Sequence, residues 1–161
     1  MRTLFFHIER ADWVFIIRAT LIWVLALLVT AYDFVQFQGM IYRFGIVNSV
    51  GLGLFSVGIS LRLLSRFTLG KHYSYGLKPP GRLIKHGVYR FVRHPIYLAL
   101  FLYSLGIPLI FVSLYGFILS LGFIPLVSYR IRIEEKMLTE KFGDEYKEYV
   151  GKTKKIIPFI Y

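Results

Sequence analysis

The sequence predicts an all-α integral membrane protein with about four transmembrane helices, a cytoplasmic loop and an amphipathic carboxyl-terminal helix. Hydrophobic residues make up 56% of the 161 residues, aromatic residues 18%, and the mean hydropathy is +0.57, which is too apolar for a soluble domain of this length. No Asp, Glu, Lys or Arg occurs from His94 to Tyr129. This stretch is nearly twice the roughly 20 residues that cross a bilayer once, so we expect a helical hairpin that crosses twice.

The first two spans are expected at residues 13–32 and 46–64. Trp13 suits a membrane interface, and Arg18 lies near enough to one end of the first span for its side chain to reach water. The second span carries small residues at helical spacing, which are typical of close helix packing. These small residues are Ser49, Gly53, Ser56 and Ser60.

The long apolar stretch supplies the third and fourth spans, at about residues 96–112 and 114–129, with a turn near Ser113. Pro108 and Pro125 are candidate positions for kinks, because proline removes a backbone donor from a helix. The two spans bring the residues on either side of the stretch back to one face of the membrane.

Lysine and arginine residues predict the orientation of the chain in the membrane. They are frequent between spans two and three and in the tail after span four, whereas the first connection holds only Arg43 and the turn near Ser113 holds none. The positive-inside rule therefore places the amino terminus, the middle loop and the carboxyl terminus in the cytoplasm. Because the cations adjoin apolar runs and form no separate basic face, we expect no nucleic-acid partner.

A cytoplasmic loop at residues 65–93 and an amphipathic helix at residues 133–150 complete the predicted fold. The loop is too polar to span, and its Lys-Pro-Pro-Gly sequence at residues 78–81 indicates a turn before an extended stretch at 82–84. In the tail, apolar residues recur every three or four positions, although Gly143 weakens the middle of that helix. We treat residues 1–161 as one domain, with amino-terminal spans at 1–68 and the remaining elements at 69–161.

A first polar cluster, Arg93-His94-Pro95-Ile96-Tyr97, opens the apolar stretch. Pro95 permits a helix to start but disfavours helical geometry at His94, which should lie just outside span three at the interface. Tyr97, three residues later, can face the same way. A helix amino terminus suits an anionic group of a ligand, but the same residues also suit a basic, aromatic membrane anchor.

A second polar cluster follows the apolar stretch and contains Arg130, Arg132, Glu134 and Glu135. Adjacent glutamates on a helix point about 100° apart, so they should serve different partners. Ion pairs along the helix surface would account for the cluster, and a ligand site in which Arg130 holds an anionic substrate group would also account for it. Only His94 among the histidines joins the cluster and the chain has no cysteine, so we expect no metal site.

Together the two clusters resemble the isoprenylcysteine carboxyl methyltransferase and phospholipid methyltransferase family of integral membrane enzymes. The resemblance covers residues 69–158, and the first two spans carry no signature. One departure is Ala99, where the family often has glycine. The shared pattern is GVYRFVRHPIY at residues 87–97, followed by Arg130, Glu134, Glu135, Leu138, Phe142, Gly143, Tyr146, Tyr149 and Pro158.

This resemblance implies S-adenosylmethionine as the cofactor, bound in a cytoplasmic pocket between the loop, the start of span three and the tail helix. It also implies methyl transfer to a lipid or lipid-like acceptor, either an isoprenylcysteine-type carboxylate or a phospholipid amine. Arg130 would face the substrate, and an amine acceptor would lose its proton to Glu134 or to solvent. The implied cofactor-binding residues are Leu83, Ile84, Tyr89, His94, Pro95, Ile96, Tyr97, Glu134 and Glu135.

Two other functions remain open from the sequence. Membrane-embedded sterol reductases, which bind NADPH, have a similar helical tail architecture, although the Arg-His-Pro-x-Tyr and paired-glutamate combination fits the methyltransferases better. A non-catalytic scaffold whose basic loop and tail bind anionic membrane lipids is the third reading. The sequence predicts a lipophilic or lipidated partner but no oligomeric state.

Overall fold

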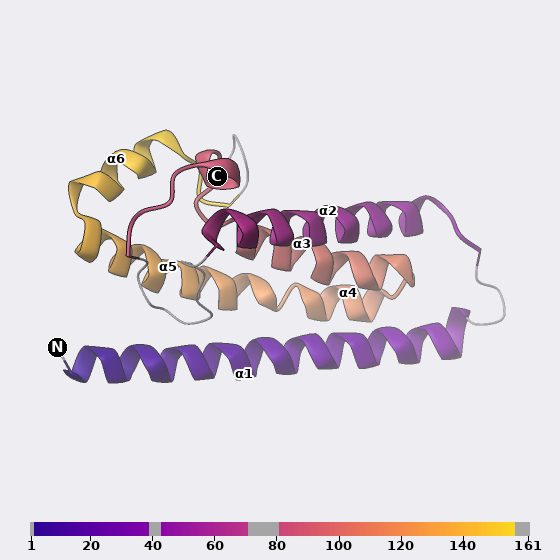
Figure 1. Ribbon diagram of the computed structural model, residues 1–161. Coiled ribbons are helices and arrows are strands. Elements are labelled where there is room, and N and C mark those ends of the chain that lie inside the picture. Colours follow the sequence, from indigo (N-terminus) through magenta and orange to yellow (C-terminus); the bar gives the residue numbers. More distant parts are fainter. Residues whose placement is uncertain (1, 39–42, 71–80, 157–161) are drawn as a thin grey trace.

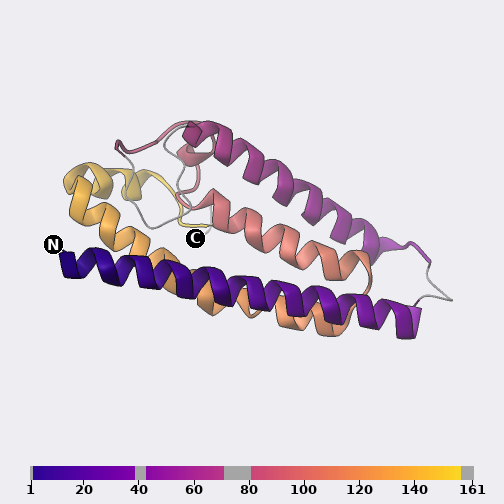
Figure 2. The same ribbon diagram turned by 60° about the horizontal axis from the view of Figure 1, so that its bottom comes forward.

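The computed structural model describes residues 2–38, 43–70 and 81–156, with side chains from residue 12 onward, and the regular elements in these ranges are helices (Figure 1). Long helices lie side by side, with α1 along α4 and α5, and α2 against α3 (Figures 1 and 2). The elements in chain order are α1 (Arg2–Asp33), η1 (Phe34–Gln38), α2 (Ile46–Leu69), η3 (Gly87–Arg90), α3 (Pro95–Ile110), α4 (Leu114–Ser120), α5 (Phe123–Phe142) and α6 (Asp144–Lys152).

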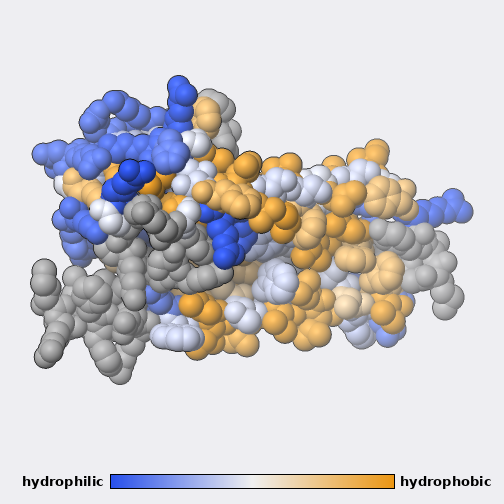
Figure 3. Space-filling model, in the orientation of Figure 1, coloured by the Kyte–Doolittle hydropathy of each residue, from blue (hydrophilic) through white to orange (hydrophobic). Residues whose placement is uncertain are grey.

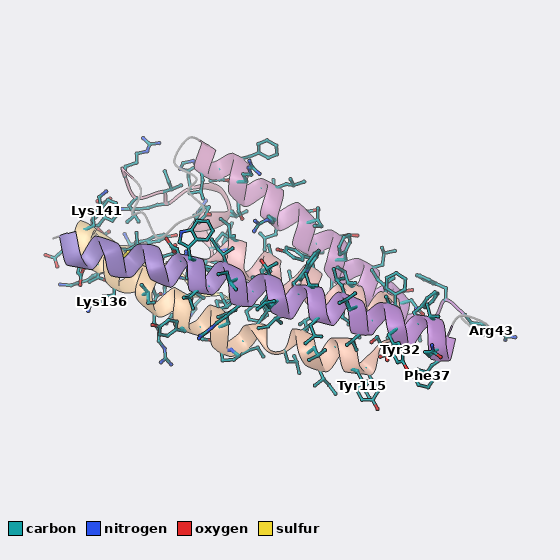
Figure 4. The ribbon with its side chains drawn as sticks, turned by 90° about the horizontal axis from the view of Figure 1, so that it is seen from below. Tyr32, Phe37, Arg43, Tyr115, Lys136 and Lys141 are labelled. Atoms are coloured by element: carbon teal, nitrogen blue, oxygen red, sulfur yellow. The ribbon has the colours of Figure 1, made fainter. Side chains whose placement is uncertain are left out.

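The surface of the bundle identifies an integral membrane protein. Apolar side chains cover the helices, while hydrophilic residues gather at the end that carries α6 (Figure 3). Lys136 and Lys141 lie at that end, and the exposed aromatic residues Tyr32, Phe37 and Tyr115 lie at the other (Figure 4). Aromatic rings at one boundary and lysines at the other are typical of a bundle whose middle contacts lipid.

Three stretches among the described residues are long and apolar enough to cross a membrane: Asp12–Phe37, Ile46–Leu69 and Leu114–Phe142. The first two contain the predicted spans at 13–32 and 46–64. The helix α3, predicted as a full span, has 16 residues, which correspond to about 24 Å against a hydrocarbon core of about 30 Å. The structure therefore supports an all-helical membrane protein, whereas the count of four spans stays a prediction.

The predicted boundary between the fourth span and a separate amphipathic helix at 133–150 is wrong. The helix α5 continues without interruption from Phe123 to Phe142, and the chain turns at Gly143, whose φ of +52° favours glycine. Apolar spans and amphipathic helices share a period of 3.6 residues, so no break is required where one changes into the other. The helix α5 therefore ends at Phe142, just before the glycine that disfavours helical geometry.

The close packing of α2 against α3 uses a different face from the predicted stripe of small residues. Ser49, Gly53, Ser56 and Ser60 are all exposed. A Cβ atom on Gly51 would lie 2.5 Å from the backbone nitrogen of Ile110, and one on Gly58 would lie 2.7 Å from that of Tyr103. Two glycines seven residues apart therefore set the distance between these helices.

Hydrogen bonds join the elements at the end of the bundle opposite α6. The hydroxyl of Ser113, which lies between α3 and α4 where the sequence predicts a turn, donates to Asp33 Oδ2 at 2.6 Å and accepts from the backbone of Gly116. The amide of Asn48 on α2 donates to the carbonyl of Ile110 at 2.6 Å. Polar groups at the helix ends are thus satisfied within the bundle.

Replacing Gly51 by alanine should destabilise the protein by about 1–3 kcal/mol, because the new methyl group overlaps the backbone of α3. Gly53→Ala is the matched control, since nothing lies within 4 Å of a Cβ atom at that position. Thermal unfolding of the detergent-solubilised protein measures both. Equal midpoints for the two variants would contradict the assigned contact face.

Candidate active site

The segment that leads into α3 is held by the carboxyl-terminal tail. Val92 and Lys154 form a parallel bridge, and the backbone nitrogen of Arg93 donates to the carbonyl of Lys154 at 2.8 Å. The nitrogen of His94 donates to the carbonyl of Lys155 at 3.1 Å. Pro95 then occupies the first position of α3, where its missing N–H costs nothing. Residues about 60 positions apart therefore meet at the start of α3.

Glu135 on α5 forms ion pairs with the segment before α3 and with the carboxyl-terminal tail. Its Oε1 lies 3.2 Å from Nε of Arg93, and its Oε2 lies 3.0 Å from Nζ of Lys155. The guanidinium of Arg93 also donates to the carbonyls of Val150 and Thr153. Because a carboxylate between two cations is strongly favoured over an unpaired one, this cluster ties α5, the segment before α3 and the tail together.

His94 lies between the two glutamates. Its side chain is buried, with Nδ1 3.8 Å from Oε2 of Glu134 and Nε2 3.5 Å from Oε1 of Glu135. Both glutamates thus contact His94, one at each ring nitrogen, although their spacing predicts different partners, and Glu134 keeps a side chain that is 33% exposed. Glu134 is therefore the more exposed carboxylate of the pair, since the side chain of Glu135 is 20% exposed.

Arg130 is buried one turn before Glu134 and binds groups from two other helices. Its Nε donates to the hydroxyl of Tyr97 on α3 at 3.3 Å, and its Nη1 forms an ion pair with Oδ1 of Asp12 on α1. The guanidinium lies over the ring of Phe15, 4.8 Å from its centre. Asp12 and Phe15 were not predicted as site residues, although an acid at the start of an apolar run is a usable signal.

The other predicted residues lie around this cluster. Tyr89 and Ile84 are buried, and Leu83 packs against Leu138, Tyr146 and Tyr149 of the helical tail. Ile96 is half-buried in the first turn of α3. Ala99 is fully buried where α3 approaches Gly58 of α2, so the departure from the family pattern lies at a helix contact.

The tyrosines of α6 attach this helix to the site. The hydroxyl of Tyr149 donates to the carbonyl of Tyr89 at 2.6 Å. Burial raises the pKa of Tyr146 and of Tyr149 well above the ordinary tyrosine value, so both phenols are neutral in the folded protein. Their stabilising effect is present below about pH 10 and is lost as the pH rises above that value.

Fold and site together define a helical membrane protein with a charged cluster, assembled from four segments, at one end of its bundle. The chain belongs to the phospholipid methyltransferase family, whose model matches residues 46–145. The match begins with α2, so the second helix carries family signal that the resemblance at residues 69–158 did not include.

Curated relatives and a solved structure agree with this assignment. A protein-S-isoprenylcysteine O-methyltransferase of Saccharomyces cerevisiae is 38% identical over 118 residues, and a probable one of Oryza sativa subsp. indica is 34% identical over 121. These matches cover 69% and 71% of this chain but only 48% and 62% of the relatives, so the chain spans less than two thirds of their length.

The solved structure is that of a eukaryotic intramembrane Ras methyltransferase, an isoprenylcysteine carboxyl methyltransferase. It superposes with a TM-score of 0.74 at 27% identity, covering 89% of this chain and 53% of that one. The likeness extends over nearly all of the present helical bundle and confirms an all-helical membrane fold.

Tyr149→Phe should lower the free energy of unfolding by about 1–3 kcal/mol at neutral pH, because the carbonyl of Tyr89 loses its buried donor. The variant should also lose less stability than the wild type above about pH 10, since one phenol with a raised pKa is gone. Thermal unfolding across pH measures both effects. Tyr129→Phe, at a residue 63% exposed, is the control and should match the wild type within about 0.5 kcal/mol.

Proposed function

We propose that this protein transfers a methyl group from S-adenosylmethionine to a lipid-like acceptor at the cytoplasmic face of a membrane. The observation that carries the proposal is that the two sequence motifs contact each other twice: His94 lies 3.8 Å from Glu134, and Arg130 donates to the hydroxyl of Tyr97. The named activity of the relatives supports it. Between the two acceptor classes open from the sequence, the buried guanidinium of Arg130 favours a carboxylate over an amine.

The residues present fit such a cofactor. Glu134 is partly exposed, and the buried Nε2 of His94 has the carboxylate of Glu135 at 3.5 Å but no hydrogen bond of good geometry among the described residues. A carboxylate and an imidazole suit the hydroxyl, ammonium and carboxylate groups of S-adenosylmethionine, which supplies an electrophilic methyl group on a positively charged sulfur. Glu134, His94 and Tyr97 would hold it, with Pro95 and Ile96 at the start of α3 beside them. Leu83, Ile84 and Tyr89 would line its adenosine end.

Glu135 would act on the cofactor site mainly by positioning. Its carboxylate is already shared between Arg93 and Lys155, and it lies 3.5 Å from His94. These contacts hold the imidazole and the start of α3 in one arrangement. A fixed arrangement of the side chains that contact the cofactor matters here, because displacement at carbon requires the attacking atom, the methyl group and the leaving atom to lie in line.

The remaining chemistry needs little from the protein. A carboxylate acceptor is an anion at neutral pH, so no base has to remove a proton from it, and Arg130 would orient it. If the acceptor were an amine, Glu134 would be the base. Arg130 is buried and Tyr97 is partly buried against the core, which would limit the access of water to the reacting groups.

The two ligands would arrive by different routes. The helices α1 and α2 expose large apolar side chains along their length, which permits a lipidated acceptor to enter from the bilayer. The hydrophilic end of the bundle, which carries α6 (Figure 3), would face water, and by the positive-inside rule that side and both termini would be cytoplasmic.

Calorimetry of the detergent-solubilised full chain with S-adenosylmethionine tests the proposal. We expect saturable binding that Glu134→Gln weakens by at least about tenfold, because an ionised hydrogen-bond acceptor is lost. Glu140→Gln, at an exposed residue of the same helix, should leave the affinity unchanged.

Absence of binding to S-adenosylmethionine together with tight binding of NADPH would favour the reductase alternative. Binding of neither, with membrane or partner association weakened when several lysines are neutralised and unchanged by single motif substitutions, would favour the scaffold alternative.

A further inference from the structure

Arg130 is the fixed member of its ion pair with Asp12. Its side chain is 5% exposed, and three groups surround the guanidinium: the hydroxyl of Tyr97, the ring of Phe15 and the carboxylate of Asp12. Removing a carboxylate from this position would leave a buried cation unpaired, which is strongly unfavourable. Arg130 therefore requires an anion at all times.

Asp12 is the member that can leave. Its side chain is 13% exposed, more than that of Arg130, and it lies where the apolar part of α1 begins. The next residue, Trp13, is 67% exposed. A change of side-chain rotamer at Asp12 would take its carboxylate away from the guanidinium, whereas Arg130 is held between α1, α3 and α5.

We propose that Asp12 is a competing carboxylate, which pairs with Arg130 in the free protein and exchanges with the carboxylate of the acceptor. This inference rests on the proposed function, in which Arg130 orients the acceptor. Exchange of one carboxylate for another keeps the buried guanidinium paired throughout, so the acceptor binds without creating an unpaired buried charge. A neutral group cannot displace Asp12 in this way.

The exchange also allows the site to bind the acceptor and release the methylated product. In the transfer, a bond forms between a carboxylate oxygen and the methyl carbon, and the bond between that carbon and the donor sulfur breaks. The electron pair of the broken bond stays on sulfur, which becomes a neutral thioether, and the carboxylate becomes a neutral ester. Because the ester no longer offers a full negative charge, Asp12 regains Arg130 and the product is released.

Chemical rescue tests the exchange without reference to activity. Asp12→Ala should lower the thermal midpoint of the detergent-solubilised chain, and sodium acetate should restore it by several degrees relative to sodium chloride at equal ionic strength. Asp33→Ala is the matched control, because Asp33 is a buried acid on the same helix whose partner is the hydroxyl of Ser113. Acetate should restore neither that variant nor a double variant Asp12→Ala/Arg130→Gln.

Binding of the acceptor class provides the second measurement. The probes are a short S-prenylated N-acetylcysteine and its methyl ester, titrated calorimetrically without cofactor into the wild type and Asp12→Asn, which keeps the shape of the side chain. With the competitor removed, the acid should bind about tenfold more tightly, and the ester should also gain affinity for the vacant donors of Arg130.

Each result has a definite meaning. If Asp12→Asn binds the acid as well as the wild type does, or more weakly, Asp12 only positions Arg130 and the proposal is overturned. The proposal is also overturned if acetate stabilises Asp33→Ala as much as Asp12→Ala. If the wild type fails to bind S-adenosylmethionine but acetate restores Asp12→Ala, the proposed function fails while carboxylate exchange stands. If the cofactor binds and Asp12→Asn gains no affinity, only the exchange fails.

Discussion

The structure depends on pairing charged side chains at the end of an apolar helix bundle. Charges at this boundary are costly unless each has a partner, and the partners available come from distant parts of the chain. Glu135 joins Arg93 and Lys155, and Arg130 joins Asp12. These contacts bring α1, α5, the segment before α3 and the carboxyl-terminal tail to one place, so the electrostatic requirement also assembles the site.

The uninterrupted helix α5 distributes the site residues between two sides. Arg130 lies one helical turn before Glu134, and Glu135 is rotated about 100° from its neighbour. Arg130 consequently meets α1 and Tyr97, while Glu135 meets the tail. His94, between the glutamates, connects the two sides. The prediction ended one helix at residue 129 and began the next at 133. A break between these positions would have removed the constant angle between Arg130 and the two glutamates.

Much of the fold could be predicted because apolar length and helical period are local properties. The first two spans and the start of α3 at Pro95 follow from them, whereas Gly143, expected only to weaken a helix at 133–150, separates α5 from α6. The small-residue stripe on α2 was predicted on the wrong face, since several faces of an apolar helix carry small residues. Only the partner helix shows that Gly51 and Gly58 make the contact and that Gly53 does not.

The sequence by itself determined an all-helical membrane protein and the residues of its two motifs, because hydropathy and motif spacing are written in neighbouring positions. Tertiary structure alone decided which charges pair. Glu135 pairs with Arg93 and Lys155, and Arg130 pairs with Asp12, 118 positions earlier in the sequence, and neither pairing was predicted. Such pairs depend on how helices approach in space, which no local pattern records.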